Sequence, residues 1–309
     1  MNYVTLHQVK EQLKITNSTD DNIFLNWIAW SSELIDWWKG RRFDIYRDTI
    51  RLDTPKQTNL KLGEYYGGEY TAVEQLFQKD LYLKTSHFDL IAIEELLNGD
   101  ETEITASQYM TEPANKPYIN RIWLKRGSSL IWLPDADNET MQAIELTGYF
   151  GYNKKYPVCF VDTGEDITSD AGLLANETLL QVSDVTQAAK DFLKPKIQIG
   201  NMLRFVSENG AEFCLVENIE SDDYGFVLTL QRGYNGTVAV AHPKDTSLFV
   251  YRVDGDILQM AIRLVQWRYR QKDQDSFDRT YNLATQTVTS PTSLPSDVRT
   301  ILGTRKADM

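Results

Sequence analysis

The stretch Ile23 to Gly40, IFLNWIAWSSELIDWWKG, decides the fold of this chain. Its apolar residues recur at alternating steps of four and three, the spacing that places side chains along one stripe of a helix. We expect a helix that buries this stripe and ends at Gly40, which suits a left-handed C-terminal cap. A stripe this broad needs a packing partner wider than one short helix. The predicted core positions are Ile23, Trp27, Trp30, Leu34 and Trp37, and Ile28, Ile35 and Trp38 widen the stripe.

The packing partner is expected near the other end of the chain. Asp254 is a candidate N-cap for a second long helix. The spacing of Thr5 and Gln8 is that of a capping box, which predicts a shorter helix ahead of the first stripe. The two ends of the chain are therefore predicted to pack as one helical bundle. The core positions predicted for the second long helix are Ile257, Met260, Leu264 and Trp267.

The middle of the chain has the pattern of strands and turns. Asn-Gly pairs at 98–99, 209–210 and 235–236 favour the backbone angles of type I′ hairpins. The polar stretch VDTGEDITSDAG, residues 161–172, indicates a join between two antiparallel β modules. We expect residues 45–165 and 166–253 to form these modules, inserted into a helical bundle of residues 1–44 and 254–309. Because helices and strands are segregated along the chain, the predicted fold class is α+β.

Composition excludes several classes of protein. The chain has 309 residues and a formal net charge of −12, which disfavours a broad positive face for unspecific DNA binding. Its two cysteines lack the spacing of a disulfide framework or a zinc site. We identify neither a signal peptide nor a membrane span. The expected protein is therefore made in the cytoplasm and has no membrane partner.

No motif in the sequence predicts a catalytic, cofactor or metal site, and we expect no enzyme. The three histidines lie far apart and form no metal-binding or catalytic pattern. PDADNET, residues 134–140, has acidic residues at alternate positions, as a calcium loop has. It lacks the later glycine and the final glutamate of such a loop, so an acidic turn is favoured.

A basic cluster, RLVQWRYRQK, lies at residues 263–272. Its tryptophan and tyrosine could stack on nucleic-acid bases. Acidic residues follow the cluster directly, so ion pairs on a helix surface are the favoured interpretation.

The corner QRGYNGTVAVAH, residues 231–242, concentrates polar and glycine residues between apolar segments. We expect Asn235 and Gly236 to provide the left-handed backbone of a hairpin and Thr237 to form a local hydrogen bond. Arg232 is expected to anchor the corner to a nearby carboxylate or carbonyl group. The alternative is a loop that grips a ligand through Arg232 and His242, but an architectural role is favoured.

The ends of the chain resemble the head-tail connector, or adaptor, proteins of tailed double-stranded DNA bacteriophages. The resemblance rests on YVTLHQVKEQLKI, Asp20–Asp21 and WWKGRRFD near the start, and on ILQMAIRLVQWRYRQKD and LPSDVRTIL near the end. AIELTGYFGYN is similar to a connector strand. The segments IGNMLRF, GAEFCLVENI and LTLQRGYNGTVAVAH are similar to a small β unit inserted in phage structural proteins. Compact connectors lack the long middle of this chain.

The resemblance implies a structural virion protein located in the neck. It would form a ring, commonly of twelve copies, that joins the portal to the tail and lines the DNA channel. The implied partners are copies of itself, the portal protein and stopper or tail proteins, while genome DNA passes through without specific binding. An acidic channel wall suits that passage. The residues implied to dock on the portal are Leu294, Pro295, Val298, Ile301, Leu302 and Arg305.

Several alternatives stay open at this point. The closing helix could instead pack on its own bundle. A stopper or tail-completion protein of the neck is the nearest alternative function. A virion-associated protein that recognises a host glycan through exposed aromatic residues is a further alternative, and a cell-wall hydrolase is another.

Overall fold

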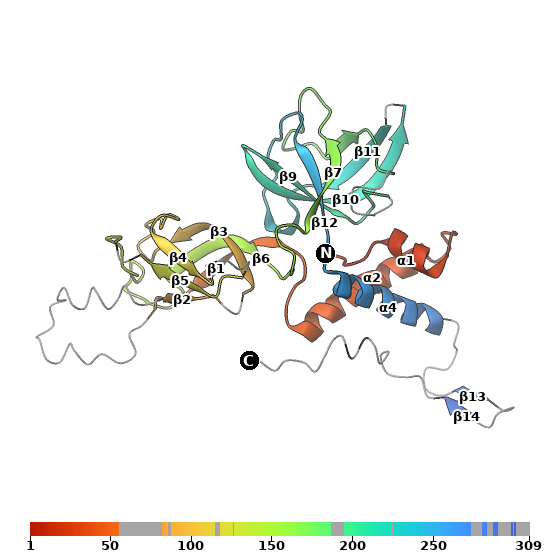
Figure 1. The fold of residues 1–309 in the computed structure, drawn as a ribbon, viewed down its shortest axis with the longest axis horizontal. Helices are drawn as coiled ribbons and strands as arrows, with labels where there is room; N and C mark the ends of the chain where they lie inside the picture. Colours follow the sequence, from red (N-terminus) through yellow and green to blue (C-terminus); the bar gives the residue numbers. More distant parts are fainter. Residues whose placement is uncertain are drawn as a thin grey trace, which may run out of the picture. The chain divides into compact units, whose positions relative to one another are not determined.

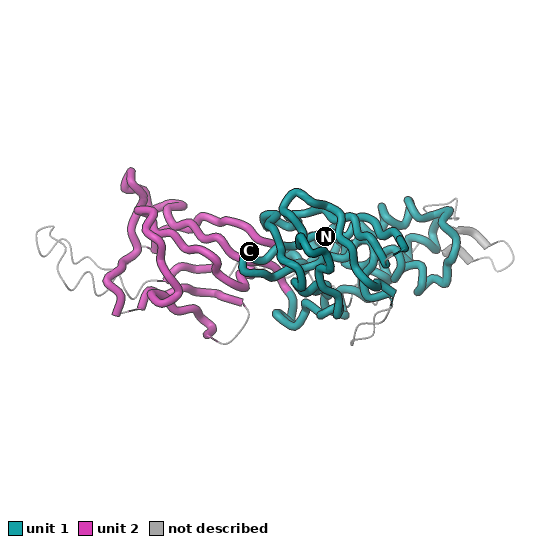
Figure 2. The backbone as a smooth tube through the Cα atoms, turned by 90° about the horizontal axis from the view of Figure 1, so that it is seen from above, with its two compact units in different colours: residues 1–44, 153–309 teal, residues 45–152 magenta. Residues whose placement is uncertain are grey.

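The computed structural model describes residues 1–55, 82–85, 88–114, 118–125, 127–186, 195–223, 225–272, 280–282, 287–289, 298 and 300. They belong to two compact units, coloured separately in Figure 2. Unit 1 comprises residues 1–44 and 153–309, and unit 2 comprises residues 45–152. The fold is α+β as predicted, with terminal helices that pack together and antiparallel sheets between them in the sequence.

Three helices of unit 1 form the predicted bundle (Figure 1): α1 at Leu6–Leu13, α2 at Asp21–Lys39 and α4 at Gly255–Gln271. The capping box of α1 is confirmed, because the backbone N–H of Gln8 donates to Thr5 Oγ1 over 3.2 Å and that of Thr5 donates to Gln8 Oε1 over 2.9 Å. Gly40 ends α2 in the left-handed conformation, with φ of 65°. Helix α2 packs against α4, and α1 packs against both.

The predicted core stripe of α2 is wrong about which face is buried. Ile23 is 37% exposed and Trp37 is 58% exposed, while Trp27, Trp30 and Leu34 are only partly buried. The buried face lies one residue further round the helix, on the side of Ile28 and Ile35, which only widened the predicted stripe. It comprises Phe24, Ile28, Ser31, Ser32 and Ile35.

The two serines explain the error. Ser31 Oγ and Ser32 Oγ both donate to the carbonyl of Ile28, and Ser32 Oγ also accepts from the backbone N–H of Tyr3. Their hydroxyl groups are satisfied inside the bundle, so these small polar residues occupy buried positions without an unpaired group. On α4 the prediction holds for Ile257, Met260 and Leu264, which are buried, but not for Trp267, which is only partly buried.

Unit 1 also contains a six-stranded antiparallel sheet in the order β7-β12-β9-β10-β11-β8. The hairpin predicted near Asn209–Gly210 is confirmed, because Ser207 pairs with Gly210. The strands are β7 at Phe160–Asp166, β8 at Leu179–Val182, β9 at Met202–Ser207, β10 at Gly210–Asp222, β11 at Gly225–Gln231 and β12 at Ser247–Tyr251.

The structure moves the expected boundary between the β modules. We expected residues up to 165 in the first module, but β7 pairs with β12 and belongs to the six-stranded sheet. Nor is this sheet separate from the helices, since both lie in unit 1. The first half of the polar stretch 161–172 lies inside the edge strand β7, and sequence patterns do not distinguish a polar edge strand from a join between modules.

The two edge strands of this sheet are linked by Glu165. Its Oε2 atom accepts from the backbone N–H of Ser183 over 2.9 Å and from that of Asp184 over 3.2 Å, just beyond β8. Its Oε1 atom accepts from Lys196 Nζ over 2.6 Å. Glu165 and Lys196 are both buried, and the same unit has an apolar core that includes Leu203, Phe205, Val216 and Leu228.

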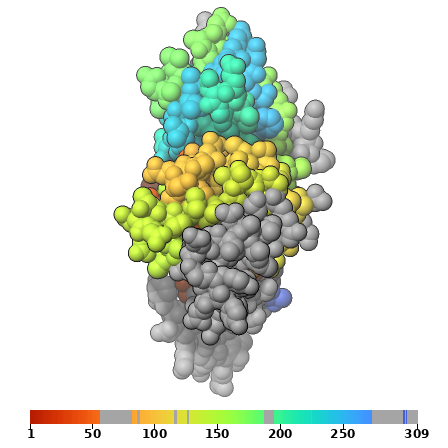
Figure 3. Space-filling model, turned by 90° about the vertical axis from the view of Figure 1, so that its left-hand side faces the viewer, coloured from red at the N-terminus to blue at the C-terminus, as the bar shows by residue number. Residues whose placement is uncertain are grey.

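Unit 2 contains two three-stranded antiparallel sheets around one apolar cluster. Asn98, directly after β3, forms hydrogen bonds with the backbone at 131–133 through its side-chain amide. The first Asn-Gly pair therefore lies in a turn that packs against this segment. Figure 3 shows strands of this unit in space-filling form, in orange to yellow-green. One sheet has the order β1-β6-β3, with β1 at Tyr46–Leu52, β3 at Leu90–Leu97 and β6 at Ile144–Phe150, and the other has the order β2-β5-β4, with β2 at Tyr82–Lys84, β4 at Tyr109–Glu112 and β5 at Arg121–Leu124.

After α4 the structure describes one further pair of short strands, β13 at Thr280–Asn282 and β14 at Thr287–Thr289. Helix α4 ends at Gln271, before these strands.

Candidate functional site

The closing segment, predicted to dock on the portal, is described at only one of its candidate residues. Val298 is helical and fully buried. The others, Leu294, Pro295, Ile301, Leu302 and Arg305, lie outside the described residues. The docking prediction therefore stays a prediction.

The half-exposed side of the helical bundle is aromatic. Trp30 of α2 stacks on Trp267 of α4, with ring centroids 6.5 Å apart and an interplanar angle of 24°. The guanidinium carbon of Arg268 lies 4.7 Å from the centroid of Trp30 and 5.4 Å from that of Trp267. We call this surface the tryptophan face; it comprises Ile23, Trp27, Trp30, Leu34, Trp37, Trp267 and Arg268.

The basic cluster at the end of α4 is used within the bundle. Arg268 lies over two tryptophan rings, where a guanidinium group is attracted by the negative face of the aromatic system. Lys272 Nζ donates to Asp20 Oδ1, directly before α2. These contacts support the interpretation of the cluster as intramolecular pairing.

At the corner, Arg232 is anchored as predicted. Its guanidinium forms a two-pronged ion pair with Glu212 of β10, from Nε to Oε1 and from Nη2 to Oε2, each over 2.7 Å. It also donates to three backbone carbonyls, of Leu174 and Glu177 over 2.8 Å and of Val240 over 2.6 Å. One side chain therefore joins the corner to β10 and to the segment before β8.

Glu212 is the centre of this network and is fully buried. Its carboxylate also accepts from the backbone N–H groups of Gly233 over 2.9 Å and Val240 over 3.1 Å. Burial alone would raise the pKa of Glu212, but hydrogen bonds from Arg232, His242 and the two backbone groups outweigh it and hold the pKa well below its usual range. The residue therefore stays ionised inside the sheet.

His242, the last residue of the corner segment, is also part of this network. Its Nε2 atom lies 3.1 Å from Glu212 Oε2, and its Nδ1 atom lies 3.0 Å from Ser207 Oγ. A neutral ring satisfies both contacts when Nε2–H donates to the carboxylate and Nδ1 accepts from the hydroxyl. The alternative of a ligand-gripping loop around Arg232 and His242 requires both side chains to be accessible to the ligand. His242 is 1% exposed, so its side chain is not accessible.

The hairpin predicted at Asn235–Gly236 is wrong. Residues Tyr234–Gly236 form a single 3-10 turn, and the next strand, β12, pairs with β7 and β9 and not with β11. The local predictions hold: Asn235 has φ of 51°, and Thr237 Oγ1 donates to the carbonyl of Tyr234 over 2.9 Å. Local turn chemistry is readable in sequence, whereas the destination of the chain after the turn depends on strand pairing.

The corner also reaches the end of the N-terminal helices. Asn235 Nδ2 donates to Asp44 Oδ2 over 2.8 Å, and Arg42 donates to the same carboxylate. Tyr251 of β12 donates its hydroxyl proton to the carbonyl of Phe43 over 2.6 Å. Burial would raise the pKa of Asp44, but the Arg42 hydrogen bond and nearby positive charge lower it overall.

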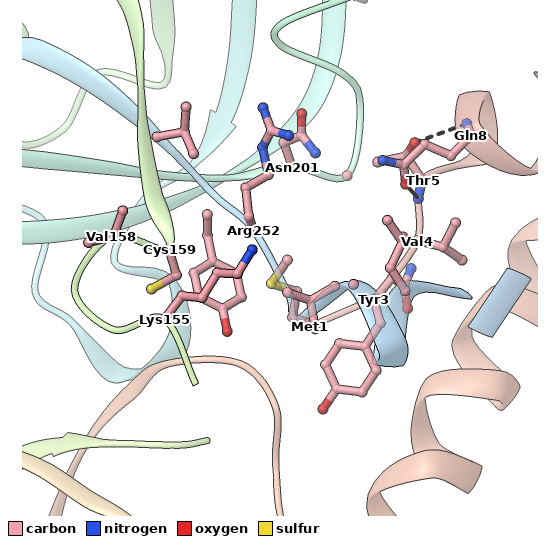
Figure 4. Close-up of a pocket in the computed structure, with 17 residues that line it drawn as sticks. Met1, Tyr3, Val4, Thr5, Gln8, Lys155, Val158, Cys159, Asn201 and Arg252 are labelled. Atoms are coloured by element: carbon pink, nitrogen blue, oxygen red, sulfur yellow. Dashed lines mark hydrogen bonds between the residues drawn. The ribbon is translucent and has the colours of Figure 1, made fainter. Parts of the chain in front are cut away.

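Unit 1 has a pocket of about 450 Å³ between the first residues of the chain, the loop before β7 and the end of β12 (Figure 4). Its lining residues include Lys155, Cys159 and Arg252 and include no aspartate or glutamate. Burial raises the pKa of the Cys159 thiol to about 12, so the group stays protonated near neutral pH and is a poor nucleophile. The pocket therefore presents no activated cysteine.

The described part of the chain has neither a metal-binding cluster nor a membrane-spanning helix. Within those ranges, no group of three or more histidine, cysteine, aspartate or glutamate side chains is placed to hold a metal ion. None of the helices described there combines the length and apolar character that a membrane span requires. A scan against protein-family models and searches of curated proteins and of solved structures found no match to this chain.

Sequence reasoning missed Glu212, Glu165 and Asp44 as structural residues. A weak signal exists for Glu212, since it is the only charged residue in the otherwise apolar segment GAEFCLV. A buried charge requires a partner, and the lone Arg232 of the corner was an available one. Glu165 and Asp44 lie among other acidic and basic residues and have no comparable signal.

Proposed function

We propose that this chain is a structural virion protein, a head-tail connector whose copies form a ring between the portal and the tail and around the DNA channel. The observation that carries the proposal is the packing of α2 against α4. Segments that resemble connector proteins lie at both ends of α2 and along α4, and these two helices meet although they lie at opposite ends of the chain. The function of such a protein is assembly.

The tryptophan face supplies the surface for that assembly. On α2, Ile23 is 37% exposed and Trp37 is 58% exposed. Covering apolar side chains of this size on a neighbouring copy stabilises association by about 25 cal/mol for each Å² removed from water. A head-to-tail contact of this kind generates a ring when its rotation closes, with each interface burying about 1,600 Å².

The charge of the protein suits a channel for DNA. The net charge of −12 lets a ring of many copies repel the phosphate backbone, so the genome slides without sticking. The basic groups at the end of α4 contact aromatic rings and Asp20 of the same chain.

Electron microscopy and sedimentation of the purified protein, alone and mixed with portal rings, test the proposal. We expect closed rings that join the portal coaxially. Replacement of Trp37 with Ser should reduce ring formation while the monomer stays folded, and Met141→Ser, also at an exposed apolar residue, is the control. A ring that binds only the tail side of the neck would identify a stopper or tail-completion protein. A folded monomer that never associates would refute the assembly role.

The closing segment is tested separately. Deletion of residues 290–309 should leave the monomer folded and abolish co-sedimentation with portal rings. Unchanged co-sedimentation would assign the closing helix to its own bundle and would leave the ring proposal in place.

A further inference from the structure

The outward face of the β2-β5-β4 sheet in unit 2 carries an aromatic platform. Side chains alternate along a strand, so Arg121, Trp123 and Lys125 share one face while Ile122 and Leu124 point into the core. Trp123 is paired across the sheet with Tyr82 on β2 and with Met110 on β4. The centre of this face is therefore a row of three large side chains.

The indole ring of Trp123 has different surroundings on its β2 side and on its β4 side. On the β2 side, the rings of Tyr82 and Trp123 lie 4.7 Å apart between centroids, and Arg121 caps Tyr82 with its guanidinium carbon 4.6 Å from the ring centroid. On the β4 side, Trp123 borders a hollow of about 490 Å³ whose lining includes Met110, Glu112 and Lys125. The size is within the range of small-ligand sites. One side of the indole is thus supported by protein and the other borders the hollow.

Polar groups are held next to the platform. Trp123 Nε1–H donates to Glu112 Oε2 over 3.2 Å, and Arg121 Nη1 donates to the same oxygen over 3.3 Å. Among the described residues, no donor contacts the second oxygen, Oε1. Lys125 Nζ donates to the carbonyl of Ser107 over 2.7 Å, which orients the ammonium group and leaves two of its three N–H donors available.

We propose that this hollow binds a sugar ring of a carbohydrate. A pyranose presents C–H groups on its face, and these match the negative face of an aromatic ring. Its hydroxyl groups both donate and accept hydrogen bonds, so they need an acceptor and a donor near the platform. Glu112 Oε1 supplies the acceptor and Lys125 supplies the donor, while the indole of Trp123 stacks on the ring.

Charge distinguishes this ligand from nucleic acid. An aromatic platform with nearby basic residues also suits stacking of bases. Here the carboxylate of Glu112 lines the hollow beside the indole, where it would repel a phosphate backbone, and the chain as a whole has a net charge of −12. Neutral hydroxyl groups meet no such repulsion.

The proposal does not rest on the connector role, since every residue involved lies in unit 2 and the assembly surface lies in unit 1. Glycan recognition was expected from the sequence, as an alternative, through other aromatic residues, Tyr65, Tyr66 and Tyr70, which lie outside the described residues. The new assignment is to Trp123, Glu112 and Lys125.

The test measures binding of the full chain to carbohydrates. The probes are insoluble peptidoglycan, chitin and cellulose in pull-down assays, followed by titration with soluble oligosaccharides of the retained polymer. We expect saturable binding to at least one probe, displaced by the soluble form. Trp123→Ala should weaken binding about tenfold or more, because it removes the stacking surface. Trp37→Ala, in unit 1, should leave binding unchanged.

Two further variants keep the test decisive if Trp123→Ala fails to fold. Glu112→Gln and Lys125→Met change side chains at the surface and should each weaken binding several-fold, with unchanged circular dichroism and melting. Trp123→Phe keeps an aromatic face and should retain part of the affinity. Absence of binding by the folded protein to any probe, full affinity in the Glu112 and Lys125 variants, or tighter binding to single-stranded DNA than to sugars would overturn the proposal.

Discussion

Asn235 donates a hydrogen bond to Asp44 over 2.8 Å, and this bond joins two sequence motifs that are 191 residues apart. Asp44 ends the segment WWKGRRFD after α2, and Asn235 lies in the corner RGYNGT. The neighbouring hydrogen bond from the Tyr251 hydroxyl to the Phe43 carbonyl joins the same segment to β12. The helices and the six-stranded sheet are therefore one compact unit, held together by buried polar contacts as well as by apolar packing.

Replacement of Glu212 with Gln should strongly destabilise unit 1. The variant leaves the buried guanidinium of Arg232 without its carboxylate, and breaking a buried pair in this way costs about 3–5 kcal/mol. Urea unfolding at pH 7 measures the change. Glu217→Gln, at an exposed position on the same strand, is the matched control and should change stability by less than about 0.5 kcal/mol. Equal stability of the two variants would show that the network is not important for folding.

The two aromatic faces of α2 should respond differently to truncation. Phe24 is fully buried, so Phe24→Ala should lower the free energy of unfolding by about 3–5 kcal/mol. Trp37 is 58% exposed, so Trp37→Ala should lower it by less than about 1 kcal/mol. Both values are measured by chemical denaturation under conditions in which the protein is monomeric. A larger loss in the Trp37 variant would restore the buried stripe that the sequence suggested.

Asp36 should make the protein less stable as the pH rises from 4 to 6. Burial raises its pKa to about 6, and this outweighs the opposing hydrogen bond from the Tyr3 hydroxyl. In the unfolded chain the pKa is about 3.9. The folded state therefore binds the proton more tightly, so its advantage is present below about pH 4 and is lost as the pH passes through about 6.

Asp36→Asn tests this dependence because the amide cannot ionise but still accepts from Tyr3. The variant should gain stability relative to the wild type between about pH 4 and 6, with a constant difference above pH 7. Since Asp36 is partly exposed, solvent screening limits the gain to about 1–2 kcal/mol. Unfolding curves at several pH values measure it, with the exposed Glu33→Gln on the same helix as the control. A difference that does not change with pH would contradict the assignment.

Gly99 should tolerate no side chain. A Cβ atom there would lie 2.3 Å from the carbonyl oxygens of both Leu133 and Pro134, whereas one at Gly127 would meet no atom within 4 Å. We expect Gly99→Ala to destabilise unit 2 by about 1–3 kcal/mol, because backbone must move to relieve the clash. Gly127→Ala should be close to neutral. Hydrogen exchange of the β3 amides, which directly precede Gly99, distinguishes the two, and equal protection would refute the close approach.

The helical part of the fold was largely predictable because its signals are local. The capping box at Thr5 and Gln8, the end of α2 at Gly40 and the buried residues of α4 follow from neighbouring residues in the sequence. The buried face of α2 does not follow from neighbouring residues in this way. Apolar residues lie on most sides of that helix, so their periodicity does not distinguish the buried face from the others. Burial of Ser31 and Ser32 depended on the approach of Tyr3 and on hydrogen bonds that no hydrophobicity pattern contains.

The sequence by itself determined the fold class, the positions of the terminal helices and the anchoring role of Arg232. Only the tertiary structure decided which carboxylate Arg232 binds, which strand follows the corner, and that β7 belongs with the helices. The physical reason is the distance along the sequence between the groups that interact. Helix caps and turns depend on backbone groups a few residues away, whereas a buried charge and an edge strand need partners from distant parts of the chain, and strand pairing selects those partners.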